Sequence, residues 1–301
     1  TQPWLWRVHG TRVGLYADFQ RQLVQADPQR RDLLISCGAA LHHLQVPAQA
    51  LGWSARVRRT PDPSEERLVA SVRLSPGRPA SDAHELLTAI RERRTDRRRL
   101  TSWPVPAERL DALCMTGDQW GAQVRPVHEQ VAKARLEQLT TRADLLQRAD
   151  PAYVREIENA TESLVNAGVP VTNIPRDDRV ATSDALNRRF PNGDLDDPVV
   201  DPGQPSDGLL VICTSSDDTM SRIRAGEALS AVWLKATRDR MSLVPLSQAL
   251  EVNETRRILQ QEVLDDKAPA QIVLRVGWLP LGRPELPPTP RRDIDDVRTQ
   301  S

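Results

Sequence analysis

The spacing of apolar residues along the chain predicts an alternation of helices and strands. From Asp27 onward, leucines recur at the three- and four-residue intervals that place side chains on one face of a helix. We expect Asp27 to cap this helix, Pro28 to occupy its first position and Pro47 to kink or divide it. Alternating apolar and polar residues over 54–60 and 67–74 then predict two half-buried strands.

Similar patterns continue through the rest of the chain. Helical spacing predicts further helices over residues 82–99, 106–115, 128–148, 151–166 and 222–237. Short apolar runs predict further strands over residues 122–127, 208–216 and 270–278. Residues 168–208, by contrast, have no periodicity and are rich in Pro, Asp, Asn and Gly, which favours a lid, a binding loop or disorder.

Two parts of the chain resemble each other. Each contains a helix with a single glycine near its start, Gly38 in the first and Gly226 in the second, and each helix leads through a connection to a strand. We interpret this similarity as an internal duplication, which is typical of folds made of two related halves.

Composition limits the classes of function. The 301 residues carry 41 Lys and Arg against 41 Asp and Glu, so the chain as a whole has no long-range attraction for nucleic acid or anionic lipid. No apolar run approaches the roughly 18–20 residues that a membrane helix needs. Cys37, Cys114 and Cys213 lie in apolar contexts, which favours buried reduced thiols and a cytoplasmic protein. The sequence begins at Thr1 without Met, so we expect residues before it.

Few residues outside the arginines stand out as candidates for chemistry. The sequence has no G-x-G-x-x-G after a strand, no G-x-x-x-x-G-K-[ST] and no G-x-S-x-G. Histidines and cysteines never reach the spacing of metal ligands, so we expect no metal; His42 and His43 are adjacent and would point apart on a helix. We interpret Trp4, Trp6 and Trp233 as core residues, because a large indole is buried wherever it fits.

Arginines are concentrated in residues 91–100, RERRTDRRRL, where they fill six of ten positions. One interpretation is a solvated helix face whose arginines pair with Glu92 and Asp96. Nucleic-acid binding is a second interpretation, against which the neutral overall balance argues. A third is one ligand phosphate, because arginine forks and a hydroxyl satisfy a phosphate dianion. The groups expected in that role are Arg93, Arg94, Thr95 and Arg97.

A resemblance to a known family supports the third interpretation. IRERRTDRR resembles the arginine–arginine–serine/threonine–x–arginine segment of the FMN-dependent nitroreductase family, which grips the flavin phosphate and ribityl chain. TQPWLWRV resembles the end of that family's second signature, and the stretch from AGEALSAVWLKAT to PPTPRR resembles its C-terminal half. In ordinary members the arginine segment comes first, whereas here the Gln-Pro-Trp segment precedes it. This order resembles a fusion of two nitroreductase-like halves and is most like the mycobacterial Acg-type branch.

The resemblance implies an α+β fold in which helices surround antiparallel-type sheets and two related halves form an internal pseudo-dimer. The first half would span residues 1–80 and the second 81–301, with a lid-like insertion at about 168–208. One FMN per chain would lie between the halves, and no residue is implied as catalytic. The implied cofactor-binding residues are Gln2, Arg93, Arg94, Thr95, Arg97, Pro245, Leu246, Ser247, Arg291 and Arg292.

The implied function is an NAD(P)H-dependent oxidoreductase, in which hydride passes from a nicotinamide to FMN and then to a nitro or quinone acceptor. The alternative is a protein that sequesters FMN under an occluding lid, with Arg188, Arg189 and Phe190 on the cofactor. A third hypothesis is a partner-binding α+β protein without a cofactor. At Ser247 and Gln248 the chain departs from the acidic residue and glycine of many active relatives. The fused halves are compatible with a monomeric pseudo-dimer or a homodimer.

Overall fold

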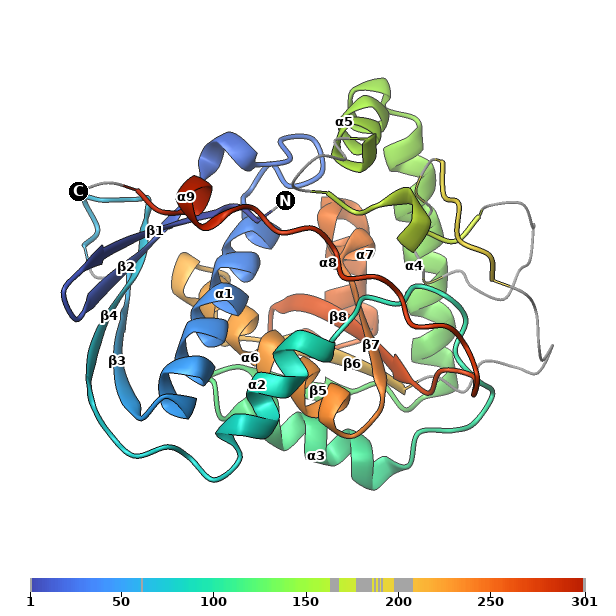
Figure 1. The fold of residues 1–301 in the computed structure, drawn as a ribbon. Coiled ribbons are helices and arrows are strands. Elements are labelled where there is room, and N and C mark those ends of the chain that lie inside the picture. The colour runs from blue at the N-terminus through green and yellow to red at the C-terminus, as the bar shows by residue number, and fades with distance from the viewer. Residues whose placement is uncertain are drawn as a thin grey trace.

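The computed structural model describes residues 2–60, 62–162, 168–176, 186, 188, 190, 192–197 and 208–299. It contains two four-stranded antiparallel sheets with helices packed between and around them, so the fold is α+β, as predicted (Figure 1).

The strands of the first sheet are β1 (Trp4–His9), β2 (Arg12–Ala17), β3 (Trp53–Arg59) and β4 (Leu68–Pro76). Those of the second sheet are β5 (Gln123–Pro126), β6 (Gly208–Cys213), β7 (Ser242–Leu246) and β8 (Ala270–Gly277). The longer helices are α1 (Arg31–Ala50), α2 (Ala83–Glu92), α3 (Ala107–Asp118), α4 (Gln130–Arg148), α5 (Pro151–Glu162), α6 (Thr219–Arg238) and α8 (Asn253–Glu262). The short helices are α7 (Gln248–Glu251) and α9 (Ile294–Val297), with 3₁₀ turns at Phe19–Arg21 and Val171–Asn173.

The two sheets share one topology. Their strand orders in space are β1-β2-β4-β3 and β5-β6-β8-β7. In each sheet a long helix connects the second and third strands along the chain: α1 joins β2 to β3, and α6 joins β6 to β7. The second strand of each sheet also has a register shift, between Leu15 and Tyr16 in β2 and between Ile212 and Cys213 in β6. This shared order supports the predicted duplication, whose boundary at residue 80 stays a prediction.

The second sheet is buried on both faces. Every residue of β6 and β8 is buried, because α3 and α6 cover one face of this sheet and α4, α7 and α8 cover the other. In β3 of the first sheet, exposed residues alternate with half-buried ones, since only one face packs against the core. The difference explains why the sequence shows continuous apolar runs in its second part and alternation in its first.

Helices α1 and α6 pack against each other between the two sheets (Figure 1). A Cβ atom added to Gly38 would lie 2.0 Å from the carbonyl oxygen of Ile223, and one added to Gly226 would lie 2.0 Å from that of Ile35. Each glycine therefore faces the carbonyl group three residues before the other glycine. The two backbones approach more closely than any side chain would allow, which explains the single glycine in each helix.

The start of α1 differs from the prediction. The helix begins at Arg31 rather than at Pro28. The N-cap position is occupied by Arg30, at φ 56° and ψ 28°, so the prediction of Asp27 as the N-cap is wrong. The Asp27 carboxylate nevertheless accepts two backbone N–H groups of the first turn, that of Arg31 at 2.6 Å and that of Leu33 at 2.8 Å. Pro47 lies inside α1 and does not divide it. Because proline has no N–H, the helix lacks the one hydrogen bond that would join residue 47 to the carbonyl group of His43.

The prediction of one helix over 82–99 is wrong in its second part. Helix α2 ends at Glu92, and Arg93 has extended backbone angles of φ −59° and ψ 135°. The arginine-rich segment therefore leaves the helix axis, and only Arg91 of its arginines belongs to a helix. The helix predicted over 151–166 is described as far as Glu162, and residues 163–167 lie outside the described residues.

Two expectations from composition can be compared with the structure. Cys37, Cys114 and Cys213 are buried free thiols, as predicted. In the part of the chain that the structure describes, no helix is both long enough and apolar enough to span a bilayer.

We expect Gly226→Ala to lower the free energy of unfolding by about 3 kcal/mol, because the new methyl group meets a backbone carbonyl that cannot move aside. Urea denaturation of parent and variant measures the difference. Gly10→Ala is the control: its methyl group meets nothing within 4 Å, and only the left-handed backbone at φ +57° opposes it, which costs about 1 kcal/mol. Equal losses in the two variants would contradict the close contact of α1 and α6.

Candidate functional site

The arginine-rich segment that follows α2 runs beside the C-terminal tail (Figure 1). Arg94 Nε donates to the carbonyl oxygen of Leu286 at 3.2 Å, and Arg283 Nη1 donates to that of Arg99 at 2.7 Å. Contacts between residues so far apart in the sequence bring Arg291 to the side of the segment where Arg93 and Arg94 lie.

Arg93, Arg94 and Arg291 form a cluster of like charges. Burial and the charges of Arg291 and Arg94 lower the pKa of Arg93 to about 10, and burial and Arg94 lower the pKa of Arg291. Arg94 Nη1 donates to the carbonyl oxygens of Arg91 at 2.6 Å and of Arg93 at 2.9 Å. Among the described residues, no carboxylate lies within ion-pair distance of any of the three. A cluster of this kind favours a bound anion.

His43 borders the same cluster. Burial, Arg93, His42 and Arg291 lower the pKa of His43 to about 3, so its ring is neutral at pH 7. His42, one position earlier, faces α6, where its Nδ1 lies 2.7 Å from Ser230 Oγ. The two rings point apart, as expected from the helix, but the sequence contains no signal that places His43 among arginines. One of these arginines, Arg291, reaches His43 only because the C-terminal tail folds back to α1.

A cavity of about 210 Å³ begins where β7 turns into α7. Its walls come from the arginine segment, the end of β7 and the described part of the predicted insertion. The lining residues are Thr95, Arg97, Leu186, Arg188, Phe190, Val244, Pro245, Leu246, Ser247 and Gln248. The structure thus brings Thr95 and Arg97 together with residues 245–247, which form the end of β7 and the residue before α7, although 148 positions (245 − 97) separate the two segments.

Arg97 lies at the aromatic end of this cavity. Its Cζ is 5.1 Å from the centroid of the Phe190 ring, and the Cζ of Arg188 is 5.9 Å from the same ring. Burial and the charge of Arg188 lower the pKa of Arg97 to about 10. Arg189, which the sequence also places at the cofactor, lies outside the described residues.

The Glu251 carboxylate holds the wall of the cavity in place. It forms an ion pair with Arg188 and accepts hydrogen bonds from Ser247 Oγ and from Gln147 Nε2, each at 2.7 Å. Behind it, burial and the charges of Glu251 and Asp27 raise the pKa of Asp32 to about 7. Sequence reasoning missed Glu251 and Asp32, because acids in a short helix and in a first helical turn have ordinary explanations.

Gln2 and Arg292 fasten the tail to the first sheet. Gln2 Nε2 donates to the carbonyl oxygen of Pro290 at 3.2 Å, and Gln2 Oε1 accepts the backbone N–H of Arg292 at 3.1 Å. The Arg292 side chain contacts the carboxylate of Asp18 at 3.5 Å and the carbonyl oxygen of Asp296 at 2.6 Å. These contacts keep Arg292 at the first sheet, while the neighbouring Arg291 belongs to the charge cluster.

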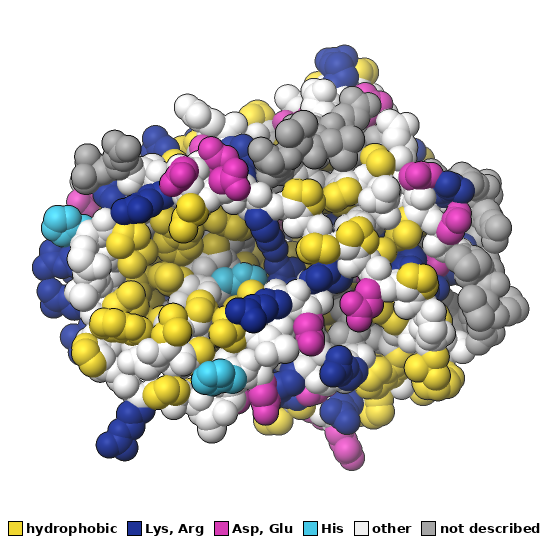
Figure 2. Space-filling model, viewed as in Figure 1, with side chains coloured by type: hydrophobic (Ala, Val, Ile, Leu, Met, Phe, Trp, Pro, Cys, Tyr) yellow, Lys and Arg dark blue, Asp and Glu magenta, His cyan; other side chains and the backbone are white. Residues whose placement is uncertain are grey.

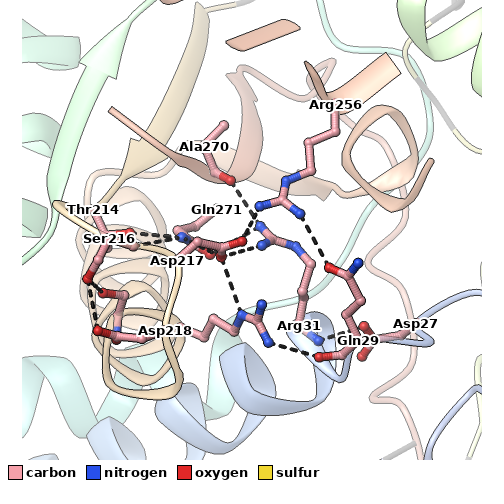
Figure 3. A network of polar contacts seen from close by, with 12 residues as sticks. Asp27, Gln29, Arg31, Thr214, Ser216, Asp217, Asp218, Arg256, Ala270 and Gln271 are labelled. Atoms are coloured by element: carbon pink, nitrogen blue, oxygen red, sulfur yellow. Dashed lines mark hydrogen bonds and ion pairs between the residues drawn. The ribbon is translucent and has the colours of Figure 1, made fainter. Parts of the chain in front are cut away.

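A second arginine cluster in the chain is built differently. Arg31, Arg222 and Arg256 converge on the single carboxylate of Asp217 (Figure 3). Arg31 Nη2 also donates to the carbonyl oxygen of Ala270 at 2.9 Å, which joins the start of α1 to β8. Burial would raise the pKa of Asp217, but the three arginines outweigh it and lower the pKa to about 2. This cluster contains its own anion and joins α1 to the second sheet.

Within the described residues, no group of three or more His, Cys, Asp or Glu side chains is arranged to hold a metal ion. Figure 2 shows a hollow lined by hydrophobic side chains over the first sheet and the neighbouring helices, with Lys and Arg side chains at its inner edge.

Comparison with known proteins gives relatives over the whole length of the chain. No family model matches. The chain is 37% identical over 299 residues to a Mycobacterium tuberculosis protein named "Putative NAD(P)H nitroreductase", a match that covers 99% of this chain and 86% of the relative. It is 30% identical over 305 residues to the M. tuberculosis "Putative NAD(P)H nitroreductase acg", with 99% and 89% covered.

The solved structures that match this chain are more distant in sequence. A Bacteroides fragilis nitroreductase with bound FMN is 15% identical with a TM-score of 0.44, and the match covers 68% of this chain and 94% of that one. A Desulfitobacterium hafniense nitroreductase with bound FMN is 13% identical with a TM-score of 0.44, and 72% and 98% are covered.

Asp217→Asn is expected to lower the free energy of unfolding at pH 7 by about 2 kcal/mol, because three arginines lose their counter-charge. Since folding lowers this pKa from 3.8 to about 2, the contribution is complete above pH 4 and is lost as the pH falls toward 2. Denaturant melts of parent and variant should therefore converge over that interval. Asp265→Asn, at an exposed pair with Lys267, is the control and should change little. A constant difference from pH 7 to pH 2 would contradict the assignment.

Proposed function

The chain belongs to the nitroreductase family, and we propose from this that it is an oxidoreductase that binds FMN and accepts hydride from NAD(P)H. The second substrate is a small nitro or quinone acceptor. Bound FMN would supply the hydride chemistry, and the chain would bind and orient it.

The arginine cluster is the observation that carries the proposal. Arg93, Arg94 and Arg291 lie close together, and the described residues offer them no carboxylate. Guanidinium forks donate paired hydrogen bonds to phosphate oxygens, and a phosphate dianion would neutralise most of the excess charge. The donor set therefore fits the phosphate of FMN. Arg292 has Asp18 as its partner, and we propose for it the role of holding the tail.

The cavity beside the cluster would accommodate part of the flavin ring. Its volume of about 210 Å³ is below the roughly 300–1,000 Å³ of a complete ligand pocket. Thr95 and Arg97 would contribute a hydroxyl and a charge from one wall, and residues 245–247 at the end of β7 would form the other. Gln2 acts indirectly, because its hydrogen bonds to Pro290 and Arg292 position the tail that carries Arg291.

Each half of the chain would contribute different residues to the proposed FMN site. We propose halves of 1–80 and 81–301 that form one pseudo-dimer with one FMN per chain. The first half contributes α1 and Gln2, and the second contributes the arginine segment, residues 245–247 and the tail. The buried free thiols support a cytoplasmic location for this protein.

Sequestration of FMN is the second candidate function. Arg188 is held by Glu251, and the Phe190 ring lies against Arg97 at the cavity wall. Side chains of the predicted insertion thus border the place proposed for the ring, where they would exclude a nicotinamide. The remainder of the proposed lid, in 177–185 and 198–207, lies outside the described residues.

The visible spectrum of the purified protein, recorded before and after anaerobic addition of NADPH, tests both functions. A two-band flavin spectrum that NADPH bleaches is expected for the oxidoreductase. A flavin spectrum that dithionite bleaches and NADPH does not would support sequestration. A protein that shows no flavin, even after FMN is added, would contradict both.

Arg93→Ala combined with Arg97→Ala is expected to weaken FMN binding by at least about tenfold, since charge-assisted hydrogen bonds contribute about 1.5–3 kcal/mol each. Quenching of flavin fluorescence measures the dissociation constant. Arg91→Ala is the matched control, because this exposed arginine of the same segment still belongs to α2. An unchanged affinity in the double variant would reject the phosphate assignment.

A further inference from the structure

Arg93 lies on an aromatic ring. Its Cζ is 4.4 Å from the ring centroid of Trp233, which projects from α6. Trp233 is 9% exposed and belongs to the apolar cluster that α3, α6 and the second sheet share. On the other side, the backbone N–H of Arg93 donates to the carbonyl oxygen of Ala89 at 2.9 Å, which holds the residue at the end of α2. The ring is therefore fixed by packing before Arg93 contacts it.

Other arginines of the same chain are oriented in a different way. Arg98, in the same segment, is paired with Asp96 at 2.7 Å. Arg59 is paired with the buried Glu227 at 2.6 Å. A carboxylate orients such a side chain, but it also neutralises the charge and occupies the fork of N–H donors. Those arginines have little left to offer an anion.

An aromatic partner orients an arginine without these two losses. The ring contacts the flat face of the guanidinium, and the N–H donors point outward in the guanidinium plane. Within the described residues, the side chain of Arg93 makes neither a hydrogen bond nor an ion pair. Its charge and its donors therefore remain available next to Arg94 and Arg291.

We propose that Trp233 is a positioning residue for the flavin phosphate, which acts by holding Arg93 in the orientation that receives the phosphate. This inference rests on the proposed function of the site and adds a residue to it. A free arginine side chain loses conformational freedom when it binds a ligand, which weakens binding. The contact with Trp233 removes that loss in advance. Its effect is limited to ligands that carry the phosphate.

The test compares FMN with riboflavin, which lacks the phosphate, in a series of variants. Trp233→Met removes the aromatic face and fills much of the space, and Trp233→Phe keeps a smaller face. Trp120→Leu is the matched control, because Trp120 packs against the same apolar cluster and its ring contacts His42 and no arginine among the described residues. Fluorescence titration gives the two dissociation constants, and thermal melts report the stability of each variant.

Trp233→Met is expected to weaken FMN binding by about three- to tenfold and riboflavin binding by less than about twofold. Trp233→Phe should restore FMN binding to within about twofold of the parent. In the background of Arg93→Ala, Trp233→Met should cause no further loss of FMN affinity, since its effect passes through that arginine. Trp120→Leu should lower the melting temperature and leave the ratio of the two affinities unchanged. Trp233→Leu replaces the methionine variant if the latter does not fold.

Three results would overturn the inference. Equal losses for FMN and riboflavin would make Trp233 a core residue only, with the proposed function intact. A full effect of Trp233→Met in the Arg93→Ala background would show that Trp233 does not act through Arg93. A parent protein that binds neither flavin nor inorganic phosphate would overturn the proposed function, and this inference with it.

Discussion

The backbone contact between α1 and α6 is the constraint on which the rest of the structure depends. Gly38 and Gly226 each face a carbonyl oxygen of the other helix, so the two helices act as one rigid unit between the sheets. That unit places His43 of α1 and Trp233 of α6 on the side where the arginine segment passes. Each sheet contributes one of the two helices, so the site depends on both halves of the chain.

Charge distinguishes the scaffold of this protein from its site. The cluster around Asp217 and the cluster around Arg93 each contain three arginines. Around Asp217 the arginines have a carboxylate, and they join α1 to the second sheet. Around Arg93 the partners are an indole ring, a neutral histidine and further arginines. The first arrangement is complete in the folded chain, whereas for the second we propose that a bound anion supplies the missing negative charge.

Glu251 connects the proposed flavin site to the predicted insertion, the segment whose role differs between the two proposed functions. The same carboxylate binds Ser247, between β7 and α7, and Arg188 of the insertion. The loop and the covering side chains are thus held by one group, and the nearby Asp32 has a pKa close to neutrality. In the proposed site, the ion pair between Glu251 and Arg188 would decide whether a nicotinamide reaches FMN, so local packing and charge would separate the two proposed functions.

Sequence alone predicted most of the longer helices and strands β3, β4, β5, β6 and β8, because these elements follow from local periodicity. It also predicted site residues in the arginine segment, at 245–247 and in the tail, since their residue types and order resemble a family, and these assignments stay predictions. Boundaries such as the end of α2 at Glu92 were missed, because the helical pattern of 82–92 has no clear stop. Only the tertiary structure decided which arginines keep a free charge. Arg98 pairs with Asp96, Arg292 with Asp18, and Arg93 lies on Trp233. Two of these three partners are more than a hundred residues away, and no local pattern encodes contacts of that range.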